Sequence, residues 1–113
     1  MAGKIIYGIK NCNTMQKAFE SLKKQGIEFE FHDYKKSGIS EEKIREWFSK
    51  ADWEKFINRQ GLTWKKLSDS EKEAVKTAED AIKLMMEKTS LIKRPVLELG
   101  KKLIIGLDPK VYP

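Results

Sequence analysis

The sequence predicts an α/β protein built on a mixed four-stranded sheet, and three stretches of the chain lead to this fold class. Residues 5–9 are apolar and run into a helical pattern, and residues 27–34 alternate apolar with polar side chains. Strand, helix and strand within about 30 residues are typical of a βαβ unit, whose two strands lie parallel. Residues 91–105 hold two apolar runs separated by a short glycine-containing turn, which predicts a β-hairpin. Between these parts, residues 37–90 have a helical pattern throughout and predict an all-helical insertion.

Length and composition limit the classes of protein to which the chain can belong. We expect residues 1–113 to form one domain with a single core. No apolar run approaches the roughly 20 residues that cross a bilayer, and the N-terminus lacks a signal-peptide core, so we expect a cytoplasmic protein that does not bind membranes. The formal net charge is +6, but most of the 23 basic residues are lysines scattered among acids. This pattern favours a solvated surface, and we expect no specific nucleic-acid binding.

The first helix should follow the first strand directly. Its apolar face is marked by residues at helical spacing, namely Met15, Ala18, Phe19 and Leu22. Gly26 suits the position just past the end of this helix. The alternation that follows places His32 on the polar face of the second strand. There we expect a histidine at the sheet edge rather than a catalytic base.

Capping residues predict where the helices of the insertion begin. Ser40 precedes two glutamates, and Asp52 precedes a short run that contains Trp53 and Phe56. Two further starts have the spacing of a capping box, Ser68 with Glu71 and Thr77 with Asp80. We expect the aromatic residues and methionines of this segment to form its core, because no cofactor motif accompanies them.

The last part of the chain predicts a hairpin that begins at Pro95. A proline can occupy the first position of a strand without loss of a ladder hydrogen bond. Gly100-Lys101-Lys102 supplies the turn, and Gly106 ends the second strand.

The only cysteine, Cys12, lies at the turn between the first strand and the first helix. A thiol at a helix N-terminus meets unpaired backbone N–H groups and the positive end of the helix dipole, and both stabilise the thiolate. Asn11, Asn13 and Thr14 suit a turn or cap, and Lys10 adds positive charge. The alternative is a buried cysteine that acts as a small hydrophobe. The polar setting favours a reactive thiol. One cysteine excludes an internal disulfide and, with one histidine, leaves a metal site without support.

Several motifs occur in an order that is characteristic of one protein family. A helix-terminal cysteine and a proline that leads into a hairpin resemble the thioredoxin fold. The further motifs are Asn11-Cys12-Asn13-Thr14, Lys17-Ala18, Phe31-His32-Asp33-Tyr34, Asn58 to Gly61, Thr63-Trp64-Lys65-Lys66-Leu67 and Ile92-Lys93-Arg94-Pro95. Together they resemble the arsenate reductase (ArsC-like) family, and within it most closely the YffB branch and more distantly the Spx transcription regulators.

The resemblance implies a role for each matching residue. Cys12 would be the nucleophile, and Arg94 would stabilise its thiolate or a bound oxyanion. Pro95 stands where thioredoxin folds hold a cis-proline, which leaves the preceding backbone free to bind an extended peptide such as glutathione. A guanidinium near a thiol lowers its pKa and can form paired hydrogen bonds to an oxyanion. The alternatives are a surface arginine and an ordinary trans-proline at the start of a strand. The groups expected to line the site are Lys10, Asn11, Asn13, Thr14, Arg59 and Pro95.

Two departures from the family pattern narrow the expected activity. Arsenate reductases use further arginines to hold the oxyanion, one in the segment that matches residues 58–61 and one just past the hairpin. Arg59 is a candidate for the first, although the YffB pattern places its arginine where this chain has Gln60. The second arginine has no counterpart, because the segment just past the hairpin is Gly106-Leu107-Asp108. The Cys-x-x-Cys switch of Spx is also absent, because position 15 is Met15.

The resemblance and these departures together predict a glutathione-dependent monothiol oxidoreductase that uses Cys12. We expect no bound cofactor, glutathione or a similar small thiol as cosubstrate, glutaredoxin as a candidate partner, and a monomer. Two alternatives stay open, a non-catalytic Spx-like protein-binding regulator and a genuine arsenate reductase.

Overall fold

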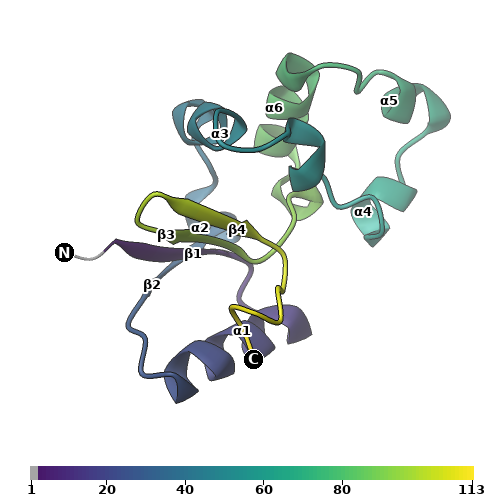
Figure 1. The fold of residues 1–113 in the computed structure, drawn as a ribbon. Coiled ribbons are helices and arrows are strands. Elements are labelled where there is room, and N and C mark those ends of the chain that lie inside the picture. Colours follow the sequence, from purple (N-terminus) through teal and green to yellow (C-terminus); the bar gives the residue numbers. More distant parts are fainter. Residues whose placement is uncertain (1–2) are drawn as a thin grey trace. The chain divides into compact units, whose positions relative to one another are not determined.

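Four strands form one mixed sheet in the order β2-β1-β3-β4 (Figure 1). In the computed structural model, which describes residues 3–113, the strands are β1 (Lys4–Gly8), β2 (Glu30–Asp33), β3 (Val96–Leu99) and β4 (Lys102–Ile105). β1 pairs in parallel with β2 and antiparallel with β3, which in turn pairs antiparallel with β4. The predicted fold class is therefore confirmed: a βαβ unit and a hairpin share one mixed sheet.

The chain divides into two compact units. The sheet unit consists of residues 3–37 and 94–113, and the helical unit consists of Gly38–Lys93. Besides the strands, the sheet unit contains α1 (Asn13–Lys24) and α2 (Tyr34–Ser37). The helical unit contains α3 (Glu41–Phe48), the 3₁₀ turn η1 (Trp53–Phe56), α4 (Leu62–Lys65), α5 (Asp69–Glu73), α6 (Ala78–Glu87) and the 3₁₀ turn η2 (Thr89–Leu91).

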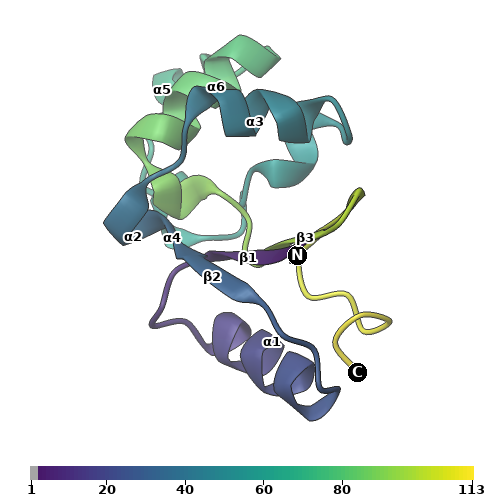
Figure 2. The same cartoon turned by 90° about the vertical axis from the view of Figure 1, so that its left-hand side faces the viewer.

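The core of the sheet unit lies between α1 and one face of the sheet, and Figures 1 and 2 both show α1 along that face. The buried side chains of this cluster are Ile6, Met15, Ala18, Leu22, Leu97 and Tyr112. The helix approaches β1 closely, because a Cβ atom on Gly8 would lie only 2.4 Å from the sulfur of Met15. This contact fixes the N-terminal half of α1, where Cys12 is located.

The end of α1 follows the sequence prediction in detail. Gly26 has φ +72°, a conformation that glycine adopts at low cost. Its N–H donates to the carbonyl of Lys23, and the N–H of Ile27 donates to that of Leu22, each at 3.0 Å. These two bonds form a Schellman motif. Because Ile27 is held in this motif, β2 starts at Glu30 instead of at the predicted position 27.

The helical unit has its own core of stacked aromatic side chains. Trp47 and Phe56 are fully buried, with ring centroids 5.6 Å apart and planes nearly parallel. On the surface, Arg45 bonds to Glu79 at 2.7 Å and to Glu41 at 2.8 Å, which ties α3 to α6. All four predicted helix caps are confirmed, with Ser40, Asp52, Ser68 and Thr77 each accepting a backbone N–H.

Short helical turns are the elements that the sequence did not predict. α2, α4 and η2 span four, four and three residues, too few to show helical periodicity. The third strand begins at Val96, one residue after the predicted Pro95. Before it, Thr89–Leu91 is a 3₁₀ turn and Ile92 forms an isolated bridge with Ile57. Across the part of the chain that the structure describes, no helix has the length and apolar character needed to cross a membrane.

Candidate functional site

Cys12 is the N-cap residue of α1 and is partly exposed. Its backbone is extended, with φ −146° and ψ 129°, and its carbonyl accepts the N–H of Gln16 at 3.0 Å. The thiol packs against the edge of the core beneath α1. The side chain thus sits where the strand ends and the orphan N–H groups of the first helical turn begin.

The surroundings of the thiol lower the pKa of Cys12 below its ordinary value. Partial burial raises the pKa, but hydrogen bonds from the backbone of Met15, from the Arg94 side chain and from the backbone of Thr14 all lower it, and so does the charge of Arg94. Every lowering contribution acts by stabilising the thiolate. The first turn of α1 contains no acidic residue to oppose them. The site therefore favours the nucleophilic form of the sulfur.

Arg94 reaches Cys12 from the opposite end of the chain. Arg94 lies just before β3. Because β3 runs antiparallel to β1, the N-terminal end of β3 lies beside the C-terminal end of β1, and Cys12 follows that end of β1 in the chain. The Arg94–Pro95 peptide bond is cis, the isomer that the family resemblance implies, and Pro95 is buried. The fold thus brings together two predicted site residues that the sequence separates widely.

The remaining predicted site residues of the sheet unit surround the thiol along the chain. Lys10, Asn11 and Asn13 are exposed and Thr14 is partly buried. Gln16 was not predicted as part of the site, yet its side-chain amide donates to the carbonyl of Lys10 at 3.2 Å. This bond closes the loop that carries Cys12. No sequence signal marks Gln16, because its bond depends on the turn geometry.

Arg94 also interacts with a cluster of aromatic side chains that includes the buried residues Tyr7 and Tyr34. Tyr34 is 1% exposed, and its hydroxyl has no hydrogen-bond partner among residues 3–113. Its ring is 6.4 Å from that of Tyr7, whose hydroxyl donates to the buried carboxylate of Glu98 at 3.1 Å. Burial raises the pKa of Tyr34 well above its ordinary value; the Tyr7 charge also raises it, and the Arg94 charge opposes both. The Arg94 guanidinium therefore acts electrostatically on both Tyr34 and Cys12.

His32 belongs to this cluster rather than to the thiol site. It lies on the edge strand β2, and its ring is 4.9 Å from that of Tyr7. The expectation of a histidine at the sheet edge is confirmed.

Arg59 lies in the helical unit, in the turn before α4. Its guanidinium stacks over the Trp64 ring at 5.3 Å and lies 3.6 Å from a carboxylate oxygen of Glu54. Both interactions are made within the helical unit.

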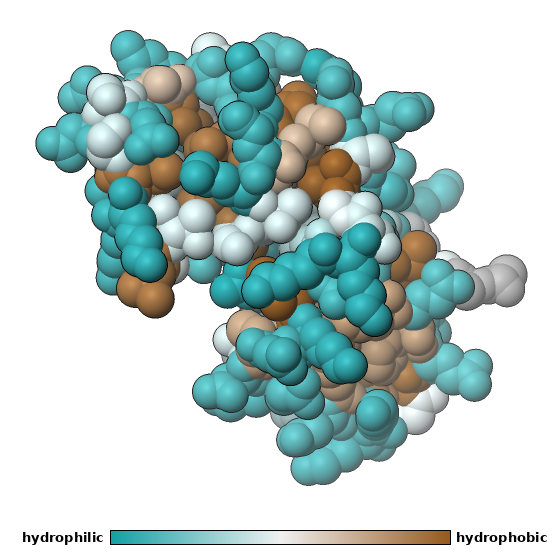
Figure 3. All heavy atoms as spheres, turned by 180° about the vertical axis from the view of Figure 1, so that it is seen from behind, coloured by the Kyte–Doolittle hydropathy of each residue, from teal (hydrophilic) through white to brown (hydrophobic). Residues whose placement is uncertain are grey.

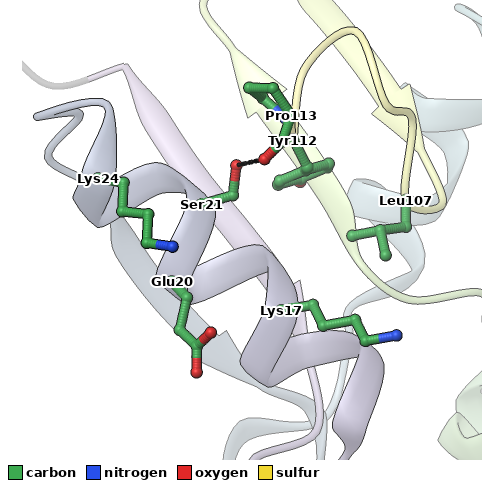
Figure 4. A pocket seen from close by; sticks show the side chains of 7 residues that line it. All are labelled: Lys17, Glu20, Ser21, Lys24, Leu107, Tyr112 and Pro113. Carbon is green, nitrogen blue, oxygen red and sulfur yellow. Dashed lines mark hydrogen bonds between the residues drawn. The ribbon is translucent and has the colours of Figure 1, made fainter.

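The described residues contain no metal-binding cluster, and a hollow lies beside α1. Residues 3–113 contain no group of three or more histidine, cysteine, aspartate or glutamate side chains placed to hold a metal ion. A hollow of about 250 Å³ lies between α1 and the C-terminal segment (Figure 4). Lys17, Glu20 and Lys24 line its helix side, and Tyr112 lines the other. None of the groups that bond to the Cys12 sulfur lines this hollow.

The fold and the site define a class of protein. A cysteine at the start of the helix that follows the first strand, opposite a cis-proline that precedes an antiparallel strand, is a thioredoxin-like arrangement. The chain belongs to the ArsC family, whose model matches residues 7–113.

Comparison with known proteins agrees with this assignment. The solved structure of the YFFB (PA3664) protein is 42% identical and superposes with a TM-score of 0.90 over 96% of this chain and 95% of that one. An arsenate reductase (ArsC) related protein from Brucella melitensis is also 42% identical, with a TM-score of 0.78 over 98% of this chain and 92% of that one. The regulatory protein MgsR of Bacillus subtilis is 30% identical over 105 residues, which cover 91% of this chain and 82% of MgsR.

Proposed function

We propose that the chain is a cytoplasmic, glutathione-dependent thiol reductase in which Cys12 is the nucleophile. The observation that carries this proposal is the convergence of backbone and guanidinium N–H groups on the Cys12 sulfur, which lowers its pKa. A thiolate exchanges with disulfides far faster than a thiol does. Membership of the ArsC family and likeness to the YFFB protein support the same reading.

The proposed cycle has two balanced exchange steps. The Cys12 thiolate attacks the glutathione sulfur of a mixed disulfide R–S–SG; the S–S bond breaks, a Cys12–SG disulfide forms, and R–S⁻ leaves and takes up a proton. A second glutathione thiolate then attacks the Cys12–SG disulfide, releasing oxidised glutathione and the Cys12 thiolate. In sum, R–S–SG and one glutathione thiol give R–SH and oxidised glutathione: the R sulfur gains one electron and the entering glutathione sulfur loses one. Because the described part of the chain holds one cysteine, the second sulfur comes from outside.

Arg94 and the loop residues have separate roles in this proposal. Arg94 holds the thiolate between attacks, and Lys10 supplies positive charge toward the carboxylates of glutathione. Asn11, Asn13 and Thr14 offer hydrogen-bonding groups around the entering sulfur. Pro95 completes the proposed glutathione-binding set within the sheet unit, the assignment of Arg59 to this set stays a prediction from the family resemblance, and glutaredoxin is a candidate partner for the second step.

Mass spectrometry after exposure to oxidised glutathione tests the proposal. We expect one glutathione adduct, located on Cys12, which reduced glutathione removes, and no adduct on Cys12→Ser. The rate of iodoacetamide alkylation against pH should also report a pKa for Cys12 below that of a free thiol. Full reductase activity in Cys12→Ser, or an unshifted titration, would contradict the proposal.

A protein-binding regulator is the second candidate function, and the 30% identity to MgsR favours it. Affinity capture under reducing conditions separates the two candidates. A stoichiometric partner that Cys12→Ser still retains would favour the regulator, provided that the glutathione adduct is absent.

Arsenate reduction is a third candidate, because the Brucella melitensis neighbour is described as arsenate reductase related. The chain has no arginine at positions 106–108, just past the hairpin, and a weaker positive field should bind the oxyanion poorly. Turnover of arsenate with glutathione and glutaredoxin would show that this argument is wrong.

A further inference from the structure

The helical unit presents one strongly exposed aliphatic side chain. Leu62, the first residue of α4, is 72% exposed, the largest value among the exposed large hydrophobic residues of the described chain. Figure 3 shows brown apolar groups among the teal hydrophilic ones on this face of the helical unit, one of which projects at the lower left. Such exposure removes the stabilisation that burial of a leucine would give.

The backbone around Leu62 is firmly held. The N–H of Lys66 donates to the carbonyl of Leu62 at 2.9 Å, and that of Lys65 donates to the carbonyl of Gly61 at 3.2 Å. In the preceding turn, the Asn58 side chain accepts the N–H of Gln60 at 3.2 Å. A Cβ on Gly61 would lie 2.8 Å from the Asn58 amide nitrogen, so the turn packs tightly against Gly61. Leu62 is thus presented on a fixed backbone, which reduces the entropy lost when a partner binds.

Basic residues are frequent in the segment of the chain that contains Leu62. From Lys55 to Leu67 the chain contains four basic residues and no acidic one. Lys65 and Lys66 are exposed, and within residues 3–113 neither takes part in an ion pair. Arg59 is held over Trp64 beside Glu54. Leu62, Lys65 and Lys66 are spaced i, i+3 and i+4, so they lie on one face of the α4 turn.

We propose that Leu62, Lys65 and Lys66, here called the α4 surface, dock an acidic peptide segment of a partner protein that carries at least one aliphatic side chain. The aliphatic group of the peptide packs on Leu62 while its carboxylates pair with the lysines. This inference concerns protein recognition and goes beyond the exchange chemistry of Cys12. A nucleic acid fits the surface less well, because a leucine offers no ring for a base to stack on and Arg59 already covers the Trp64 ring.

Selection from a random peptide display library tests the proposal, with the whole protein as target. We expect selected peptides to be rich in aspartate and glutamate and to contain leucine, isoleucine or valine. Titration of a selected peptide into the ¹⁵N-labelled protein should shift the amides of residues 58–67. Leu62→Ser should weaken peptide binding about tenfold. The double variant Lys65→Glu/Lys66→Glu should make the remaining peptide affinity independent of salt concentration.

Matched controls come from the same unit. Met86 is 44% exposed on α6 and Lys83 is exposed nearby, so Met86→Ser and Lys83→Glu change apolar exposure and charge away from the α4 surface and should bind normally. Thermal unfolding checks that each variant is folded.

Several outcomes would overturn the proposal. These are a selection that yields no peptide, selected peptides without acidic residues, shifts outside residues 58–67, or unchanged binding by Leu62→Ser. Shifts at the same amides on addition of a uridine oligonucleotide, insensitive to Leu62→Ser, would assign the surface to nucleic acid. Shifts that grow with protein concentration alone would assign it to a second copy of the chain.

Discussion

Arg94 is the side chain that most clearly links the fold to the chemistry of the thiol. It contributes both a hydrogen bond and a positive charge to Cys12, while partial burial of the sulfur acts in the opposite direction. The two backbone donors of the first helical turn remain whatever residue occupies position 94. The arginine is therefore the part of this environment that a single substitution can remove.

Replacing Arg94 with alanine should raise the pKa of Cys12. The contribution of burial, which raises the pKa, would remain, while two of the lowering contributions would be lost. We expect the alkylation rate at neutral pH to fall several-fold and the titration midpoint to move up. Lys93→Ala is the matched control, because it removes one exposed positive charge next in sequence. Equal effects of the two substitutions would contradict a specific role for Arg94.

The lowered pKa of Cys12 also predicts how stability depends on pH. In the unfolded chain the thiol keeps its ordinary pKa near 9.0, whereas the folded protein loses the proton at lower pH. Between the two pKa values the unfolded chain binds more protons, so the free energy of unfolding rises with pH. The stability of the wild type relative to Cys12→Ser should therefore grow across this window and level off above about pH 9. Urea unfolding of both proteins under reducing conditions measures this difference in the free energy of unfolding at each pH. A difference that stays constant or falls as the pH rises would contradict the prediction.

α1 owes its position to a close contact as well as to its apolar face. Gly8 leaves room for the Met15 side chain against β1, and Met15 is fully buried. The same methionine stands where Spx regulators have a second cysteine. In this chain the position contributes to packing of the helix that carries the thiol.

Gly8→Ala should destabilise the protein by about 1–3 kcal/mol, because the new methyl group would overlap the Met15 sulfur. The cost should be smaller in a Met15→Ala background, where the overlap is gone. Denaturant unfolding of the double-mutant cycle measures this coupling. Gly3→Ala is the control, since its Cβ would make only ordinary contacts at 3.7 Å. Additive effects of the two core substitutions would show that the contact does not limit packing.

Helices that carry their own capping groups could be predicted from sequence, whereas the single-turn helix α4, which lacks a capping side chain, could not. Thr77 with Asp80 and Ser68 with Glu71 form capping boxes within four residues, so their signal is local. α4 has no capping side chain, and it is held through contacts of its turn, such as the 2.7 Å bond from the N–H of Asn58 to the carbonyl of Leu91. Such contacts join distant parts of the sequence and leave no local pattern.

Charge is unevenly divided between the two units of the molecule. Residues 1–37 and 94–113 contain eleven lysines and arginines against six aspartates and glutamates, whereas residues 38–93 contain twelve against eleven. Most of the net charge of +6 thus belongs to the unit that contains Cys12. The resulting field should favour anionic partners of the thiol.

The Cys12 thiolate should therefore react faster with an anionic disulfide than with a cationic one. Glutathione disulfide and cystamine provide the pair, and a neutral disulfide, hydroxyethyl disulfide, serves as the reference. The preference should shrink as ionic strength rises, because at about 0.1 M salt charges are screened beyond roughly 10 Å. Stopped-flow measurement of the exchange rates at several salt concentrations would show it. A rate order that is independent of charge or of salt would argue against electrostatic steering.

Local residue patterns were sufficient to predict the βαβ order, the hairpin, the capped helix starts and the place of Cys12 at the start of α1. Each of these depends on residues within a few positions of one another, so their patterns are readable along the chain. The family resemblance, and no local pattern, implied that Arg94 lies beside the Cys12 sulfur, as the structure has it. Only the folded chain shows that Gln16 closes the thiol loop, that Tyr34 is buried and that Leu62 is exposed. These features depend on which strands pair and how the turns close, and the free energy of such contacts is set by distances in space that sequence spacing does not encode.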